Sequence, residues 1–235
     1  MNFFDRFQGV FFSPQQTFKA ISEKPVWIDA LIILLVLLAI FTYIASPFLQ
    51  KDSLQAMKDN LKLKERYGEE RYNQMIERLE NTSQTTIMVR SFLATPFTFL
   101  IGFLFSSLII LALGRLFSAE GNYRQVFAAY LHANFIDKIL GNSLRLVLVL
   151  SRKSFAQVTT SLALFFPKLE MTSKAYVVVS QVDFFQIWLF GIFALALSTI
   201  FKIKMKKALL ISYSFWFLKS LIYVVLGFLS LSYFQ

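Results

Sequence analysis

The chain has 235 residues, of which 56% are hydrophobic and 28 are phenylalanine, and its mean hydropathy is +0.57. This composition excludes an ordinary water-soluble domain and indicates a helical protein whose apolar surface is solvated by lipid. The formal net charge is +10, but the bases lie beside apolar runs, which is typical of contact with anionic headgroups rather than nucleic acid, and the absence of cysteine excludes disulfides and thiolate metal sites.

Residues 1–27 are predicted to form a segment at the membrane surface. Residues 1–12 are rich in phenylalanine but too short to cross a membrane, so we expect them to lie in the interface. A second short helix is expected to begin at Ser13-Pro14 and to end near Ser22, with Gln16 completing a capping box. The first apolar run begins only near residue 28 and is too long for the core of a signal peptide, so no cleavable leader is expected.

Five apolar runs are long enough, or nearly so, to cross a hydrocarbon layer of about 30 Å as helices. The predicted fold is therefore all-α, a polytopic bundle of five transmembrane helices in one membrane domain, residues 28–235. The predicted spans cover about residues 28–49, 91–115, 126–150, 183–201 and 208–234. Trp27 is expected to anchor the first span at the interface.

Residues 51–90 differ in kind from the spans, because they hold seven of the fourteen acids and eight of the bases. An apolar stripe at helical spacing within them is made of Tyr72, Met75, Ile76 and Leu79. This pattern predicts water-facing amphipathic helices in an extracytoplasmic loop. The stripe either packs back on the protein or is a docking surface for a partner helix.

Residues 154–182 contain an apolar run that stops at Pro167. The run is too short to cross a membrane, so we expect the segment to lie at the membrane surface or to dip into it.

The third predicted span carries polar residues that cannot face lipid, because a charge at mid-membrane costs about 2.5–3.5 kcal/mol. Residues whose spacing places them on one helical face are Asn134, Lys138, Asn142 and Arg145, and Asp137 lies beside them. Three interpretations remain open: a structural polar seam, a buried contact to a partner protein, or part of a permeation path. His132 is expected to be a satisfied interior imidazole, since no second histidine or cysteine exists to complete a metal site.

The last two spans form a hairpin around a short basic hinge. Its bases, Lys202, Lys204, Lys206 and Lys207, are expected to contact anionic headgroups on the cytoplasmic side. With five spans, the N-terminus is then cytoplasmic and the C-terminus extracytoplasmic. The bases do not divide cleanly, nine inside against twelve outside, so the inverted topology is the alternative. Lys219 lies within the last span, and its expected ionic partner is Asp183 or Asp137.

Several short stretches occur in a fixed order over most of the chain apart from residues 51–90. They are Phe12-Ser13-Pro14, Thr17-Phe18, Ile21, Pro25-Val26-Trp27, Gly121, Val126, Ala128-Ala129-Tyr130, Thr160-Ser161-Leu162-Ala163 and residues 182–188. Together they resemble the Yip family, the Ypt-interacting multipass membrane proteins, and particularly its bacterial branch. The resemblance implies a five-helix bundle with a cytoplasmic N-terminus and an extracytoplasmic C-terminus.

The same resemblance implies binding of prenylated Rab-type GTPases for eukaryotic members, and a link to ABC-type exporters for some bacterial ones. Two departures limit what carries over. Lys138 and Arg145 stand where the family would have a more apolar third span, and a bacterial chain has no Rab to bind.

Two function classes fit these patterns. The first is a non-enzymatic scaffold or adaptor in the cytoplasmic membrane of a bacterium, acting through another membrane protein or through self-association. The alternative is a permease, channel or transporter-associated subunit, for example accessory to an ABC-type exporter, that uses the polar face of the third span. If the chain is eukaryotic, an ER or Golgi membrane is expected instead.

An enzyme is not expected. The sequence has no clustered metal ligands, no Gly-x-Ser-x-Gly elbow and no glycine-rich phosphate loop. No cofactor, metal ion, nucleic acid or soluble small-molecule substrate is predicted.

Overall fold

The computed structural model describes residues 1–156 and 158–234, and within them the fold is all-α, as predicted. The helical segments are α1 (Phe3–Phe12), α2 (Pro14–Glu23), α3 (Ile28–Asp59), α4 (Leu61–Tyr67), α5 (Glu69–Glu80), α6 (Gln84–Val89), η1 (Arg90–Ala94), α7 (Thr95–Arg115), α8 (Tyr123–Ala133), η2 (Phe135–Gly141), α9 (Asn142–Arg152), η3 (Leu162–Phe165), α10 (Lys174–Val179), α11 (Phe184–Ile200) and α12 (Met205–Phe234). The segments η1 and η2 are π-helical, and η3 is a 3₁₀ turn.

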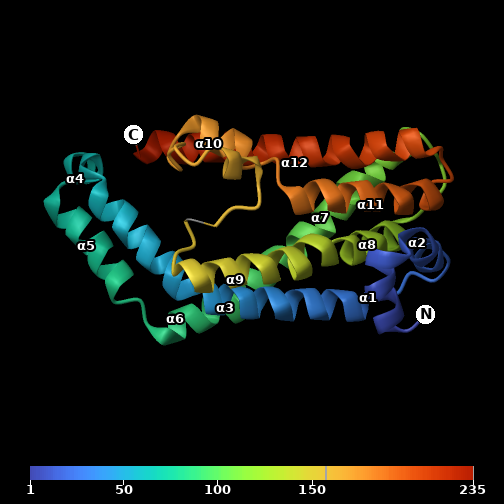
Figure 1. The fold of residues 1–235 in the computed structure, drawn as a ribbon, viewed down its shortest axis with the longest axis horizontal. Helices are drawn as coiled ribbons and strands as arrows, with labels where there is room; N and C mark the ends of the chain where they lie inside the picture. The colour runs from blue at the N-terminus through green and yellow to red at the C-terminus, as the bar shows by residue number, and fades with distance from the viewer. Residues whose placement is uncertain (157, 235) are drawn as a thin grey trace.

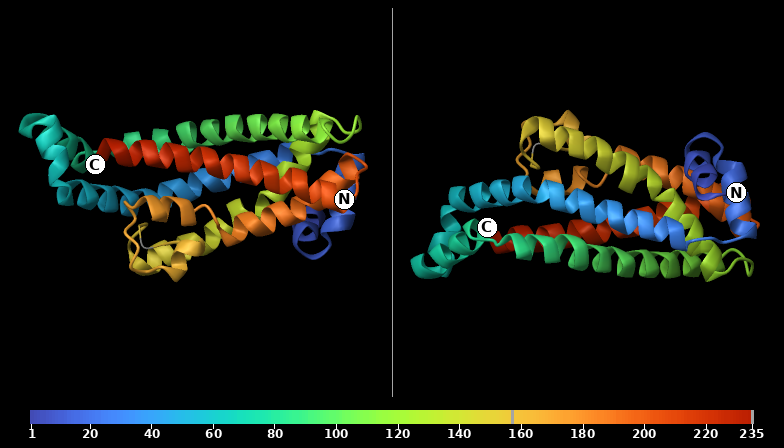
Figure 2. Two further views of the ribbon diagram at one scale, coloured as in Figure 1. Left: turned by 90° about the horizontal axis from the view of Figure 1, so that it is seen from above. Right: turned by 90° about the horizontal axis from the view of Figure 1, so that it is seen from below.

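Helical rods run side by side along the long axis of the molecule (Figure 1). They are α3, α6–η1–α7, α8–η2–α9, α11 and α12. One end holds the N-terminus, α1, α2 and the turn between α11 and α12, whereas the C-terminus lies at the other end with α4 and α5 (Figure 2). The two termini therefore lie at opposite ends of the bundle.

Three helices among the described residues are long and apolar enough to cross a membrane. They are Ile28–Asp59, Gln84–Arg115 and Met205–Ser232, and α11 is apolar but shorter. The rod α8–η2–α9 carries Asp137, Lys138 and Arg145, so it is less apolar than the other rods.

The rod α8–η2 is the centre of the core. Residues 126–133 are all buried, and so are Phe135, Ile136 and Asp137. The small side chains of Ala128, Ala129 and Ala133 let neighbouring helices approach closely, and α8 packs against α2, α3, α7 and α11. Protein therefore surrounds the buried polar side chains of this segment, which are His132, Asn134 and Asp137.

Both prolines inside the long rods are accommodated without ending the helix. Pro47 has no N–H for the Tyr43 carbonyl, and the Ser46 hydroxyl donates to that carbonyl instead, at 2.8 Å. The helix α3 consequently continues ten residues past the predicted span. Pro96 follows the π-helical turn η1, whose wider winding relieves the clash between a proline ring and the carbonyl four residues earlier.

The first two helices form a hairpin that belongs to the core, since Val10, Phe18 and Ile21 are buried in it. The predicted capping box at Ser13 is wrong, because its side chain makes no capping bond, while its carbonyl accepts a hydrogen bond from the Thr17 hydroxyl at 3.0 Å. The box is found instead at the start of α1, between Asn2 and Asp5.

At the opposite end of the molecule, α5 packs against the extension of α3. The predicted stripe on α5 is half-buried, and the Tyr72 hydroxyl donates to the Met57 carbonyl at 3.2 Å. The stripe therefore packs back on the protein. In residues 158–183, α10 packs along α12, with Val177 against Gly227.

Candidate functional site

Arg145, in the first turn of α9, is the hub of a polar network within the bundle. Its Nη1 donates to Asp137 Oδ1 and to Asn142 Oδ1, both at 2.9 Å. Its Nη2 donates to both carboxylate oxygens of Asp183, at 3.2 and 3.1 Å, and its Nε donates to Thr160 Oγ1 at 3.1 Å. The Arg145 guanidinium thus connects η2 and α9 to Thr160 and to Asp183, the residue just before α11.

Asp183 enters this network as the N-cap of α11. Its Oδ1 accepts hydrogen bonds from the backbone N–H groups of Phe185 and Gln186, at 2.9 and 3.2 Å, where the helix dipole also favours a negative charge. The Thr160 hydroxyl donates to Oδ2 at 2.5 Å. An isolated antiparallel bridge pairs Ser161 with Asp183 and places Thr160 beside the carboxylate.

Asp137 occupies the buried centre of the network, with a side chain only 2% exposed. Its Oδ2 accepts from Gln186 Nε2 at 2.5 Å and lies 2.8 Å from the Lys138 ammonium. The Oε1 of Gln186 accepts in turn from Lys219 Nζ. Gln186 therefore connects the carboxylate on η2 to the base on α12.

The predicted pair of Asp183 and Lys219 is corrected by this geometry. Arg145 is the ionic partner of Asp183, whereas Lys219 donates to the neutral Gln186 and lies 5.0 Å above the ring of Phe190. The alternative partner, Asp137, is reached only through Gln186. The reason is that Asp183 turns its carboxylate toward its own helix N-terminus and toward α9.

The predicted single polar face of the third span is also corrected. Lys138, Asn142 and Arg145 do converge, and Asp137 joins them, but the amide of Asn134 donates to the Tyr130 carbonyl at 2.8 Å. The π-helical winding of η2 is the cause, because its wider turn rotates the residues beyond it relative to a regular helix. Asn134 consequently lies outside the network.

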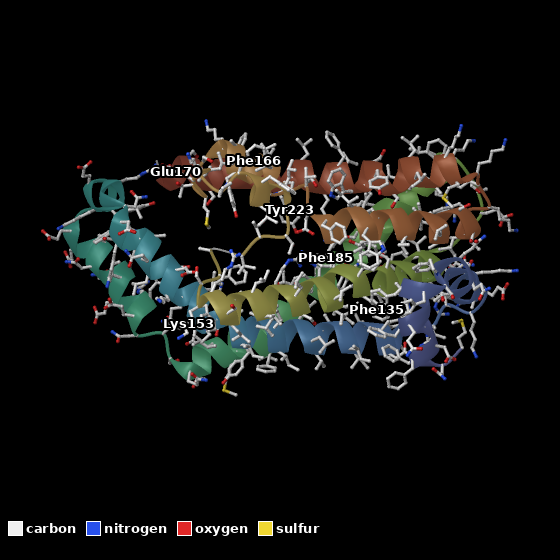
Figure 3. All side chains as sticks on the ribbon, in the orientation of Figure 1. Phe135, Lys153, Phe166, Glu170, Phe185 and Tyr223 are labelled. Atoms are coloured by element: carbon white, nitrogen blue, oxygen red, sulfur yellow. The ribbon has the colours of Figure 1, made fainter. Side chains whose placement is uncertain are left out.

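The charges of the network are covered by aromatic rings as well as by hydrogen bonds. The Arg145 guanidinium lies 5.5 Å from the centre of the Phe185 ring, and Lys138 Nζ lies 5.3 Å from that of Phe99. Phe185 lies near the middle of the bundle in Figure 3. Such contacts favour cations in a poorly hydrated setting. The three bases and two aspartates give the network a net charge of +1.

A second polar cluster ties α1 to the base of the bundle. The guanidinium of Arg6 is buried; it donates to Asp29, to His132 Nε2 at 3.1 Å and to the Met1 carbonyl at 2.8 Å. His132 Nδ1 lies 2.8 Å from the Ala128 carbonyl, so this nitrogen carries the hydrogen and Nε2 accepts from Arg6. His132 is thus a satisfied interior imidazole, as predicted.

Residues around the Arg6 cluster seal it with aromatic contacts. The ring of Phe135 lies 6.0 Å from that of Phe3 and 5.5 Å from that of Phe7, at the end of the bundle shown in Figure 3. The N-terminal hairpin is therefore held by the ion pair between the buried Arg6 and the partly exposed Asp29, and by ring packing.

The remaining predicted positions lie at the same end. Trp27 packs edge-on against Phe127, with ring centres 5.5 Å apart. All four hinge lysines are exposed; Lys202 lies 3.3 Å from Glu120, and Lys207 lies over the ring of Phe117. Nothing in this geometry prevents the hinge lysines from meeting headgroups.

Sequence reasoning missed four participants in the two clusters: Thr160, Gln186, Arg6 and Asp29. Thr160 and Gln186 lie in two of the stretches that resemble the Yip family, residues 160–163 and 182–188. Their side chains are neutral, so a search for charged residues within the spans does not find them. Arg6 is 126 positions from His132, and no sequence spacing indicates that contact.

The fold is all-α, and its long apolar helices around a polar network are typical of a membrane protein. The Yip1 domain family matches residues 9–227 of the chain, which is most of its length. The chain belongs to the Yip1 domain family. No curated protein and no solved structure matches it.

Proposed function

We propose that this chain is a non-enzymatic membrane scaffold or adaptor that crosses the membrane five times and acts through other membrane proteins. The observation that carries the proposal is the cross-satisfaction of the intramembrane charges. Both aspartates and Arg145 form hydrogen bonds with one another and with neighbouring polar groups. A network closed on itself supports the structural interpretation of the seam.

Two surfaces are then available for partners. The outer half of α12 exposes a continuous set of large apolar side chains, Phe217, Leu218, Leu221, Ile222, Val225, Leu226 and Leu229. The helices α4 and α5 extend beyond the bundle at the same end (Figure 1) and carry mostly exposed charged residues. The apolar surface of α12 and the charged surface of α4 and α5 lie at the same end. Together they suit contact with another membrane protein that also has a part outside the membrane.

The proposed orientation places the α11–α12 hinge and the N-terminus in the cytoplasm. Two features support it: the four hinge lysines lie in a short turn, and short basic loops favour the cytoplasmic side. The C-terminus, α4 and α5 are then extracytoplasmic. We place the protein in the cytoplasmic membrane of a bacterium, following the branch of the family that the sequence resembles.

The test is purification of the tagged chain from its own host in lipid nanodiscs, with mass spectrometry of co-purifying proteins. We expect stoichiometric recovery of a membrane protein with the wild type, and its loss in the surface variant Leu221→Trp, Val225→Trp. The matched control, Leu108→Trp on the exposed face of α7, retains the partner. A homogeneous chain without any partner contradicts the proposal.

A permease subunit is the second candidate, favoured by the net positive charge of the network and by the partial exposure of Lys138, whose side chain is 22% exposed. In that case Lys138→Gln abolishes the flux of an anionic solute in proteoliposomes while the folded bundle persists. Under the adaptor proposal, wild type and Lys138→Gln give the same flux as empty vesicles.

A further inference from the structure

A cavity of about 420 Å³ lies at the end of the bundle opposite the hinge. Its volume is within the range of small-molecule sites. One wall is a face of α3 that runs from Phe41 to Ser53, and the other wall belongs to α6, η1 and the start of α7. Twelve residues along α3 correspond to about 18 Å, so the cavity is elongated parallel to the helices.

The lining mixes apolar side chains with hydroxyl and amide side chains along its whole length. Apolar side chains on both walls include Phe41, Ala45, Leu49 and Ile87, and Phe155 covers one side. Arg90 is the one charged residue among the described residues of the lining. Its side chain is exposed and makes no ion pair or side-chain hydrogen bond in the described part of the chain.

Ser91 follows Arg90 in the sequence, and its hydroxyl has no hydrogen-bond partner in the described part of the chain. Ser91 lines the cavity and is 1% exposed, yet its Oγ has no partner among the residues that the structure describes. A buried hydroxyl without a partner is costly and calls for an explanation. Both residues belong to the π-helical segment η1, and such irregular turns are frequent at binding sites.

The position of Arg90 along its rod indicates the depth of the site. Arg90 and Arg115 are 25 residues apart, which is about 37 Å of helix. A hydrocarbon layer is about 30 Å thick. When Arg115 lies at one headgroup level, Arg90 therefore lies at the other, and the part of the cavity near Phe41 and Thr95 extends into the hydrocarbon.

From this geometry we propose that the cavity binds one anionic phospholipid of the outer leaflet. The phosphate accepts hydrogen bonds from the exposed Arg90 guanidinium and, once the lining moves to uncover its buried Oγ, from Ser91, and an acyl chain lies between α3 and α7. The guanidinium matches a phosphate better than an ammonium does, because its planar N–H groups bind two oxygens at once.

The test uses the full chain, delipidated in detergent, with native mass spectrometry of added lipid. The probes are phosphatidylglycerol, zwitterionic phosphatidylcholine, uncharged diacylglycerol and inorganic phosphate. We expect one phosphatidylglycerol per chain, and weaker retention of the other two lipids. Inorganic phosphate that displaces the lipid at equal concentration would show a free-phosphate site and overturn the proposal, as would the absence of any adduct.

Three variants locate the lipid. Arg90→Gln weakens retention at least about tenfold, and Ser91→Ala weakens it by about threefold, from the usual strengths of charged and neutral hydrogen bonds. Thr42→Phe fills the cavity while keeping both polar groups, and it also abolishes retention. Retention by Thr42→Phe would show that the lipid lies on the surface, which contradicts the proposal.

The matched control is Lys51→Gln, which removes one exposed base at the same end of the bundle without touching the cavity. It retains the lipid as the wild type does. Equal losses in Lys51→Gln and Arg90→Gln would mean that general charge attraction, rather than a built site, holds the lipid. Circular dichroism and gel filtration confirm that each variant is folded.

Discussion

The network around Arg145 and the ion pairs of the outer helices use the same residue types in opposite surroundings. Inside the bundle, the side chains of Asp137, Arg145 and Asp183 are 2%, 19% and 14% exposed. Outside it, Lys64 and Glu69 pair at 2.6 Å with side chains 44% and 71% exposed. A buried pair is costly to break because the remaining charge has no water, whereas an exposed pair contributes little. Distance alone therefore says little about the importance of an ion pair here.

The largest effect is expected from Arg145→Leu, which leaves two carboxylates without their cation inside the bundle. Loss of one member of a buried ionic network typically costs about 3–5 kcal/mol. We expect a large loss of stability, measured by thermal unfolding in detergent. Arg124→Leu, an exposed base on the same rod, is the control and should unfold as the wild type does.

A triple variant sharpens this result. Arg145→Leu combined with Asp137→Asn and Asp183→Asn removes the unpaired charges along with the cation, and should recover part of the lost stability. Equal instability of the single and triple variants would contradict the electrostatic explanation.

A smaller and local effect is expected from Arg6→Leu, which breaks the cluster holding α1. Hydrogen bonds to charged groups are worth about 1.5–3 kcal/mol each. The chain has no cysteine, so a single Phe3→Cys substitution reports on α1 alone. We expect maleimide to label this introduced thiol faster in the Arg6→Leu background. Phe4→Cys is the control, because Phe4 is already exposed and the labelling rate at that position should not change.

The smallest effect is expected from the exposed pair on the outer helices. The hydrogen bond from Lys64 lowers the pKa of Glu69, and the same hydrogen bond raises the pKa of Lys64. Any stability from Glu69 is thus lost as pH falls, and any from Lys64 as pH rises. Because both side chains are in water, Lys64→Ala should leave the unfolding temperature unchanged from about pH 5 to about pH 9, within experimental error. A clear shift would show that α4 and α5 are coupled to the bundle through this pair.

Much of the architecture could be predicted from hydropathy alone. The apolar runs mark the rods, and the spacing of Tyr72, Met75, Ile76 and Leu79 marks the face of α5 that packs on α3. These signals are local, since each depends only on residues within a few helical turns. Three rods meet the criteria for crossing a membrane, and α11 is shorter.

The network could be predicted only in part, for two physical reasons. A π-helical turn changes the angular spacing of side chains, so a face drawn with regular helical spacing included Asn134, which lies outside the network. The choice of partners also depends on where α11 begins relative to α9 and α12. That relation between distant segments made Arg145, rather than Lys219, the partner of Asp183.

The length of α11 has a consequence for the surrounding bilayer. Its 17 residues span about 25 Å, some 5 Å less than an average hydrocarbon layer, whereas the 30 residues of α12 span about 45 Å. In the proposed five-span arrangement, lipids beside α11 therefore meet a shorter apolar length than lipids beside α12. We expect a local hydrophobic mismatch that thins the membrane on this side and makes the protein favour thinner bilayers.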